Sequence, residues 1–364
     1  MLDIVQPTLL LDKVKCIENI ERIISKARTS EVELRPHFKT HQSHEIGRWF
    51  RVRGVKGCTV SSLEMAEYFA SDKWIDITVA FPLNILEIDR INRLASQIKL
   101  NLLISVPGVI PTLLKRLENH VGLFIEVDTG YHRTGVDPDE IRTIDLIIEE
   151  IQSSPLLKMV GFLSHAGQTY HCHNVEEVFT IHKSEVELLN RLKKRYEPKF
   201  PDLILSIGDT PTASVVENFK DVDEIRPGNL VFYDLTQHQI GSCKLDQIAI
   251  ALACPVVATY PNRNEIVIYG GGVHFSKDYF TTVSGGRSYG SVVKMKRNSW
   301  ELPPTEMYVK SISQEHGVIH APDSAAAHIQ PGDVLGILPV HSCLMADAMG
   351  EYTTTDGALI ERFN

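Results

Sequence analysis

A lysine between two histidines stands out near the start of the chain. Lys39 lies in E-L-R-P-H-F-K-T-H-Q, residues 33–42, directly after a short apolar run that is typical of a buried strand. A lysine amine that is partly desolvated and close to other cations can form a Schiff base with a carbonyl compound. An isolated lysine is more commonly a solvated loop residue, so Lys39 needs partners before it indicates chemistry.

Candidate partners follow later β-rich runs. Arg133 stands between Gly130 and Gly135 in E-V-D-T-G-Y-H-R-T-G, where the glycine backbone suits the close approach of a ligand. A plain turn with an exposed arginine is the alternative. Tyr170 belongs to S-H-A-G-Q-T-Y-H. Two further runs end in S-I-G-D-T-P-T and E-I-R-P-G-N-L, whose small residues and backbone N–H groups suit a phosphate.

These segments need a scaffold that brings them together. Helical patterns such as residues 84–98 and 175–195 alternate with eight β-rich runs: V-E-L-R-P-H-F, K-G-C-T-V, I-D-I-T-V-A-F, L-N-L-L-I-S, G-L-F-I-E-V-D, K-M-V-G-F-L-S, L-I-L-S-I-G and V-D-E-I-R-P. The alternation predicts parallel strands, and eight such units fit a (β/α)₈ TIM-type barrel with its active site at the carboxyl ends of the strands. A doubly wound open sheet is the competing architecture.

The pattern changes near residue 245. The later apolar runs are separated by Gly, Pro and Asn turns without long helices, which predicts a mostly antiparallel β domain. A chain of 364 residues also exceeds what one hydrophobic core usually organises. We therefore expect a barrel domain over residues 9–244, and a β domain formed by residues 1–8 and 245–364.

On this scaffold the candidate residues indicate a cofactor. A lysine, an arginine, a tyrosine and a phosphate-binding backbone, each at a strand end, together point to pyridoxal phosphate. Downstream, P-V-H-S-C contains His341 and Cys343, which would share one face if they lay in a strand. Imidazole plus thiolate suits zinc, and two ligands leave positions open for water or substrate. An H-x-C pair is more commonly two unrelated residues.

Composition excludes several classes of protein. The net charge of −9 and the pI near 5.9 argue against nucleic acid or an acidic membrane surface as a partner. Six cysteines without repeated spacing read as reduced thiols. The first residues show no secretory signal, and no apolar run approaches the roughly 18–20 residues of a membrane span. We expect a cytoplasmic protein.

The motifs resemble the fold-type III pyridoxal-phosphate enzymes such as alanine racemase, and more closely the D-threonine aldolase and D-serine dehydratase family. R-P-H-F-K-T-H is similar to the lysine motif of that family, although Gln42 stands where a basic residue is frequent. H-S-C looks like the zinc pair of the dehydratases, whereas the aldolases tend to carry an aspartate at the position of Cys343. The segment G-G-G-V-H-F-S-K-D, residues 270–278, differs from the segment expected in a D-serine dehydratase. This difference bears on which substrate the protein uses and not on which cofactor it binds.

The resemblance implies a role for each candidate residue. Lys39 would bind the cofactor covalently, Arg133 would contact its ring hydroxyl, and either Tyr170 or Arg226 would contact its ring nitrogen. The remaining roles are phosphate binding by Gly208, Thr210, Gly228 and Asn229, and zinc binding by His341 and Cys343. His316, in S-Q-E-H-G, is a further candidate at the catalytic site, as a neighbour of the zinc.

The implied reaction is the elimination of water from a small D-amino acid that resembles D-serine, which gives a keto acid and ammonia. A lyase of this type removes the α-proton with the lysine amine, and zinc assists departure of the hydroxyl. The alternatives are a D-threonine-type aldolase that yields glycine and an aldehyde, an amino-acid racemase, and a pyridoxal-phosphate-binding protein without catalysis. The resemblance also implies a homodimer.

Overall fold

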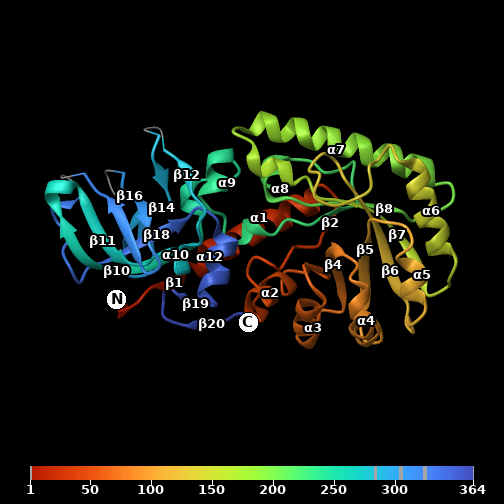
Figure 1. Ribbon diagram of the computed structural model, residues 1–364, viewed down its shortest axis with the longest axis horizontal. Coiled ribbons are helices and arrows are strands. Elements are labelled where there is room, and N and C mark those ends of the chain that lie inside the picture. The colour runs from red at the N-terminus through yellow and green to blue at the C-terminus, as the bar shows by residue number, and fades with distance from the viewer. Residues whose placement is uncertain (1, 283–284, 303–305, 323–325, 364) are drawn as a thin grey trace. The chain divides into compact units, whose positions relative to one another are not determined.

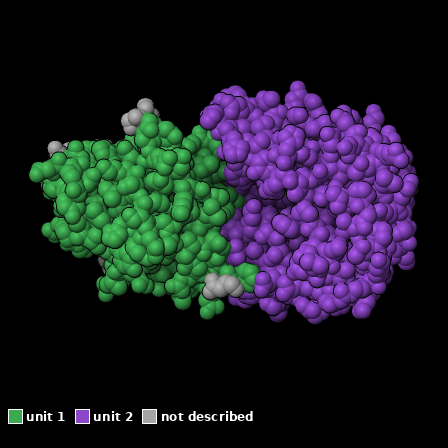
Figure 2. All heavy atoms as spheres, in the orientation of Figure 1, with its two compact units in different colours: residues 1–20, 229–364 green, residues 21–228 purple. Residues whose placement is uncertain are grey.

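The computed structural model describes residues 2–282, 285–302, 306–322 and 326–363. They divide into two compact units (Figure 2): unit 1 contains residues 1–20 and 229–364, and unit 2 contains residues 21–228. The domain boundaries at residues 8–9 and 244–245 stay predictions. Within the described residues, no helix is long and apolar enough to cross a membrane.

Unit 2 is built on a parallel sheet. Its strands are β2 (Glu33–Leu34), β3 (Cys58–Val60), β4 (Asp76–Pro82), β5 (Lys99–Ile104), β6 (Val121–Val127), β7 (Leu157–Ser164), β8 (Ile204–Ile207) and β9 (Glu224–Ile225). They are hydrogen-bonded in the order β2-β9-β8-β7-β6-β5-β4-β3, and a parallel bridge between His37 and Thr59 joins the two ends of this order. The eight predicted β-rich runs therefore form the predicted TIM-type barrel, and the open-sheet alternative is wrong.

Helices alternate with these strands, and Figure 1 shows α4 to α7 on the outside of the sheet. The helices are α1 (Lys13–Thr29), α2 (His44–Arg51), α3 (Leu63–Ser71), η1 (Ile85–Glu87), α4 (Ile88–Ala95), α5 (Ile110–Leu114), α6 (Ile141–Gln152), η2 (Gly167–His171), α7 (Val175–Tyr196) and α8 (Thr210–Val215). Side-chain caps fix several starts: Ser62 accepts from the Met65 amide at α3, and Asn174 accepts from the Glu177 amide at α7.

The barrel strands are buried on both faces. In β6 every residue except Gly122 is buried, as expected of a parallel strand covered by helices. Leu103, Phe124 and Leu163, on three neighbouring strands, form one buried cluster. Gly161 in β7 is required by close packing, because a Cβ atom there would lie 1.9 Å from the carbonyl oxygen of Ile204.

Unit 1 is a mostly antiparallel β structure, as predicted. Its strands are β1 (Thr8–Leu11), β10 (Ile250–Tyr260), β11 (Glu265–Tyr269), β12 (Phe280–Thr281), β13 (Arg287–Ser288), β14 (Gly290–Met295), β15 (Trp300–Glu301), β16 (Tyr308–Ile312), β17 (His316–His320), β18 (Val334–Pro339), β19 (Glu351–Thr354) and β20 (Leu359–Glu361). Its helices are η3 (Asn229–Val231), α9 (Leu235–Ile240), η4 (Leu245–Gln247), η5 (Pro261–Arg263), α10 (Gly272–Phe275) and α12 (Ser342–Met349).

The main sheet of unit 1 closes on itself. Strands β11, β17, β16, β14, β18 and β10 pair in that order, and β10 also pairs with β11. Strand β1 is antiparallel to β10, with Thr8 opposite Ala253, and parallel to β19, with Leu10 opposite Thr353. The N-terminal strand is therefore held by strands from the last third of the chain.

Candidate cofactor and metal sites

Lys39 lies in the turn that follows β2. The bridge between His37 and Thr59 fixes the backbone immediately before it, and Phe38 and Thr40 on either side are buried. The Lys39 amide donates to Nδ1 of His37 at 3.3 Å, and the Gln42 side chain donates to the Lys39 carbonyl oxygen at 3.1 Å. The backbone is thus anchored on both sides while the lysine side chain is exposed.

Three cations and two imidazoles gather around this turn. Burial lowers the pKa of His37 well below its usual value, and the charges of Lys39, Arg226 and Arg133 act in the same direction. Burial and the same three cations lower the pKa of His165 to about 3, although its hydrogen bond to the Gly208 carbonyl oxygen opposes the change. Both imidazoles are therefore neutral across the physiological range, and the three predicted cations share one region of unit 2.

Arg226 is held rigidly in this region. Its side chain is buried, its Nε donates to Ser206 Oγ at 2.6 Å, and one terminal nitrogen donates to the Ser164 carbonyl oxygen. Burial lowers the pKa of Arg226 to about 10, against the opposing charges of Glu224, Glu185 and Glu126. The guanidinium remains charged at neutral pH and its direction is fixed by neighbouring strands.

A buried ion pair that the sequence analysis did not predict supports Arg226. Ser206 Oγ donates to Glu224 at 2.6 Å, and the other oxygen of Glu224 accepts from Arg35 Nε at 2.6 Å. Arg35 also binds Asp76 at 2.7 Å. Arg35 directly precedes Pro36 in the lysine motif, but nothing in the sequence signals a partner nearly two hundred residues away.

The residues predicted to bind phosphate lie at the ends of β8 and β9. A Cβ atom on Gly208 would lie 2.9 Å from the Cβ of Arg226, and one on Gly228 would lie 2.7 Å from the His37 carbonyl oxygen. Within the part of the chain that the structure describes, Thr210 Oγ1 is buried without a hydrogen-bond partner, and the Thr210 amide donates to the Tyr170 hydroxyl at 3.3 Å. We call Gly208, Thr210, Gly228 and Tyr170 the cradle.

Arg133 lies in a shaped loop after β6. Gly130 and Gly135 both have φ near +110°, a conformation that disfavours other residues. The Asp128 carboxylate accepts from the amides of Gly130 and His132, at 2.9 and 3.0 Å. The Arg133 side chain is exposed and its guanidinium lies 5.2 Å from the ring centre of Tyr131. The two glycines therefore shape the backbone of this loop, and the approach of a ligand to Arg133 stays a prediction.

In unit 1, His341 and Cys343 do not lie in a strand, so that part of the sequence interpretation is wrong. Strand β18 ends at Pro339, His341 is the N-cap residue of α12, and Cys343 lies in the first turn of that helix. The cause is a long-range contact: the Asp234 carboxylate accepts from the amide and hydroxyl of Ser342, at 3.0 and 3.2 Å. This contact starts the helix between the two residues.

The His341–Cys343 pair has polar neighbours that the sequence analysis missed. Asp278 Oδ2 lies 3.1 Å from His341 Nδ1. Burial opposes a charged His341, but the hydrogen bonds with Asp278 and Cys343 and the charge of Asp234 raise its pKa to about 11. The Asn229 side-chain nitrogen lies 3.7 Å from Cys343 Sγ and donates to Asp234 at 2.6 Å. The side chain of Asn229, a predicted phosphate residue, is thus directed to this pair.

His316 is exposed on β17, opposite Tyr269. The neighbour of His341 that the structure provides is Asp278, so the role of His316 at the metal stays a prediction. Among the described residues, no group of three or more His, Cys, Asp and Glu side chains is arranged to hold a metal ion.

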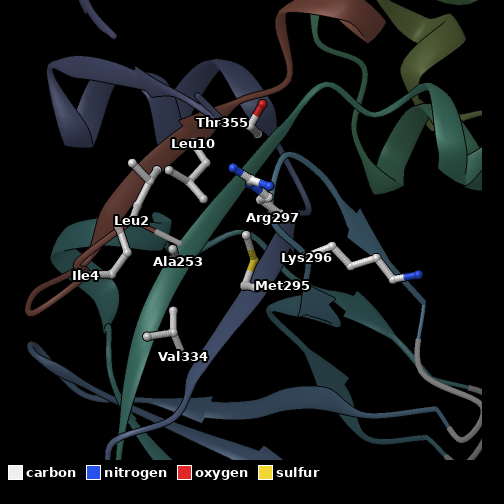
Figure 3. Close-up of a pocket in the computed structure, with 9 residues that line it drawn as sticks. All are labelled: Leu2, Ile4, Leu10, Ala253, Met295, Lys296, Arg297, Val334 and Thr355. Atoms are coloured by element: carbon white, nitrogen blue, oxygen red, sulfur yellow. The ribbon is translucent and has the colours of Figure 1, made fainter. Parts of the chain in front are cut away.

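Unit 1 also contains a small pocket whose lining residues differ from the predicted site residues. Figure 3 shows it lined by the N-terminal segment and by residues of β10, β14 and β18, with Arg297 and Lys296 from the turn after β14. Its walls are mostly apolar, and it contains none of the predicted site residues.

The comparisons with known proteins agree with this fold. Residues 11–235 match the alanine racemase N-terminal domain family, and residues 249–355 match a serine dehydratase domain. The chain therefore belongs to the alanine racemase-like, fold-type III family, in its D-serine dehydratase group. It is an enzyme of the lyase type found in that group.

Three relatives illustrate the similarity. The chain is 28% identical to D-serine dehydratase of Dictyostelium discoideum, over 98% of this chain and 94% of the relative. It is 27% identical to D-threo-3-hydroxyaspartate dehydratase of Delftia sp., over 93% and 90% of the two chains, and a structure of that enzyme superposes with a TM-score of 0.90 at 25% identity over 100% and 98%. D-Threonine aldolase of Filomicrobium marinum has a TM-score of 0.83 at 18% identity over 99% and 95%.

Proposed function

We propose that the protein is a dehydratase of small D-hydroxyamino acids that uses pyridoxal phosphate and zinc. The observation that carries the proposal is the cluster of Lys39, Arg133 and Arg226 around two neutral imidazoles at the ends of the barrel strands. Two dehydratase relatives cover nearly the whole chain and support the reaction class.

The residues of unit 2 fit this cofactor. Thr210 Oγ1 is a buried hydroxyl without a hydrogen-bond partner among the described residues. Gly208 and Gly228 allow the backbone to pack closely against Arg226 and His37, which brings the ends of β8 and β9 beside the lysine turn. The Tyr170 hydroxyl accepts from the Thr210 amide, so Tyr170 is better placed to bind the phosphate than the ring nitrogen of the cofactor. Arg226, charged and fixed by Ser206, is then the partner of the ring nitrogen.

Pyridoxal phosphate, joined to the Lys39 amine, supplies an electron sink for the substrate α-carbon. Once the substrate amine has replaced it on the cofactor, the Lys39 amine would be free to accept the α-proton, and the anchored turn would keep it close. Arg133 binds the ring hydroxyl. The neutral imidazoles of His37 and His165 add no further positive charge beside the three cations.

The residues of unit 1 fit zinc. A thiolate and an imidazole form a borderline-soft donor pair, and Asp278 is placed to orient His341 as a carboxylate does for many zinc-bound histidines. Zinc supplies Lewis acidity towards the substrate hydroxyl, a poor leaving group. A solved variant of a D-threo-3-hydroxyaspartate dehydratase is described as the metal-free form, which supports a metal in the reaction of this group.

The product separates this function from its alternatives. Purified protein is incubated with D-serine, D-threonine and D-threo-3-hydroxyaspartate, with and without a chelator. A dehydratase gives a keto acid and ammonia, and the chelator stops the reaction. Glycine plus an aldehyde would show an aldolase instead, and L-amino acid would show a racemase.

A spectrum tests the cofactor assignment without any substrate. Lys39→Ala should abolish the visible absorbance of the bound cofactor, whereas Lys183→Ala, an exposed lysine on α7, should leave it unchanged. An unaltered spectrum in Lys39→Ala contradicts the assignment. We also propose a homodimer in the cytoplasm, and sedimentation equilibrium of the purified protein tests the dimer.

A further inference from the structure

The side-chain nitrogen of Asn229 has three hydrogen-bond acceptors around it. Asn229 lies in η3 and is 5% exposed. Its Nδ2 donates to Asp234 Oδ2 at 2.6 Å and to Ser342 Oγ at 2.9 Å, and it also donates to Cys343 Sγ at 3.7 Å. The nitrogen must face Asp234, because an amide oxygen there would place two acceptors 2.6 Å apart. It is therefore an N–H group, and not the amide oxygen, that faces the sulfur.

The Asp234 carboxylate fixes the direction of this amide. It is 1% exposed, and besides Asn229 its Oδ2 accepts from the amide and the hydroxyl of Ser342, at 3.0 and 3.2 Å. Its Oδ1 accepts from the Gln237 amide at 3.0 Å and so caps the start of α9. One buried carboxylate thus holds the side chain of Asn229 against the first residue of α12, the helix that carries Cys343.

Two hydrogens of the Asn229 nitrogen are available to these three acceptors. The bond to Asp234 is charge-assisted and occupies one hydrogen. The second hydrogen can be accepted by the Ser342 hydroxyl or by the Cys343 sulfur. A sulfur that carries negative charge accepts more strongly than a neutral hydroxyl, so a deprotonated, metal-binding Cys343 would draw this hydrogen to itself.

Packing alone does not account for an amide at this position. Asn229 Oδ1 is buried and has no hydrogen-bond partner within the described residues, which costs free energy of folding. A leucine of similar volume would fill the same space without a buried polar oxygen. The amide therefore points to a role for its N–H groups, and the sulfur of a predicted metal ligand is among the acceptors that they reach.

We propose that the Asn229 side chain donates an N–H group to the Cys343 sulfur and so positions this thiolate for the metal, with Asp234 holding the amide in place. The inference rests on His341 and Cys343 as the metal pair of the proposed function. Partners that orient a metal ligand contribute about 10–100-fold to metal affinity. A hydrogen bond also stabilises the lone pairs of a thiolate, which raises the energy of its charge-transfer band to a bound metal. Asn229 and Asp234 are positioning residues.

Zinc affinity and a cobalt spectrum of the full-length protein, with its cofactor bound, test this role. Asn229→Leu should weaken zinc binding about 10–100-fold in competition with a chelating dye. In the spectrum of the cobalt protein minus that of the zinc protein, where the cofactor absorbance cancels, the sulfur-to-cobalt band should move to longer wavelength. Wild-type zinc affinity and an unmoved band in Asn229→Leu would overturn the proposal.

Asn19→Leu is the matched control. Asn19 is 2% exposed, belongs to unit 1 and donates to the Gln247 carbonyl oxygen at 2.9 Å, so its replacement also removes a buried amide. This variant should keep the zinc affinity and the cobalt band of the wild type. If it lost as much zinc affinity as Asn229→Leu, the loss of any buried amide in unit 1 would explain the effect, and the positioning role would be refuted.

Ser342→Ala tests the same contact in the opposite direction. It removes the hydroxyl that competes with the sulfur for the second hydrogen, while the backbone amide at position 342 still reaches Asp234. The cobalt band should therefore move to shorter wavelength. An unmoved band, or a move to longer wavelength, contradicts the proposal even if Asn229→Leu does not fold. A wild-type protein that binds no zinc would refute the metal pair and this inference together, whereas unchanged zinc binding in Asn229→Leu refutes the inference alone.

Discussion

Replacing Arg35 with methionine tests the buried ion pairs that support the barrel. The guanidinium is 6% exposed and binds Glu224, which is 2% exposed, and Asp76. Methionine keeps the apolar stem, but among the described residues it leaves Glu224 with the Ser206 hydroxyl as its hydrogen-bond donor. Because breaking a buried pair leaves an uncompensated charge, we expect a loss of about 3–5 kcal/mol in the free energy of unfolding.

Arg53→Met is the matched control. Arg53 also forms an ion pair within unit 2, but its partner Glu21 is 57% exposed. Exposed pairs contribute about 0–1 kcal/mol, so this variant should be close to wild type.

Thermal unfolding, followed by circular dichroism in one buffer, compares the two variants. For a domain of this size each kcal/mol lowers the midpoint by about 2–4 °C, so Arg35→Met should unfold about 6–20 °C below wild type, and Arg53→Met less than about 4 °C below it. Equal decreases of the unfolding midpoint in the two variants would show that the burial of Glu224 does not determine how much stability is lost. The reasoning would also fail if Arg35→Met unfolded at the wild-type temperature.

Three other changes have defined outcomes. Gly208→Ala should weaken pyridoxal phosphate binding about tenfold or more in a fluorescence titration, because its Cβ would lie 2.9 Å from Arg226, and wild-type affinity would contradict the cradle. Asp278→Asn should weaken zinc binding about 10–100-fold in a competition assay with a chelating dye, and unchanged affinity would remove Asp278 from the site. Burial raises the pKa of Asp76, but the bonds to its cationic partners outweigh burial and lower the pKa overall. The stability that Asp76 contributes to the folded protein is therefore fully present above the usual pKa of an aspartate, and it is lost as the pH falls through the lowered pKa. Asp76→Asn should therefore reduce the acid sensitivity of unfolding, and an identical pH profile would count against this.

The barrel could be predicted from sequence because its signal is local. Each strand is a short buried run, such as residues 122–128 or 158–164, bounded by turn residues and followed by a helical pattern. The glycines around Arg133 were equally readable, because a left-handed backbone demands that residue type.

Contacts between side chains that lie far apart along the chain could not be predicted from the sequence. The sequence interpretation considered His341 and Cys343 on one face of a strand, whereas β18 ends at Pro339 and the two residues lie at the start of α12. The helix that holds them depends on Asp234, more than one hundred residues earlier, and hydrogen bonds over that separation leave no pattern in one sequence. The same holds for Arg35 and Glu224, whose pairing exists only once β2 lies beside β9.

Strand β1 has a consequence for how the molecule is made on the ribosome. Its neighbours β10 and β19 are translated about 240 and 340 residues later, so the N-terminal segment emerges long before anything can pair with it. At about 5–20 residues per second, this interval is on the order of tens of seconds, and residues 21–228 are complete within it. The barrel can thus form during synthesis, while unit 1 must wait until β19 has been translated, with an open strand that invites aggregation or chaperone binding.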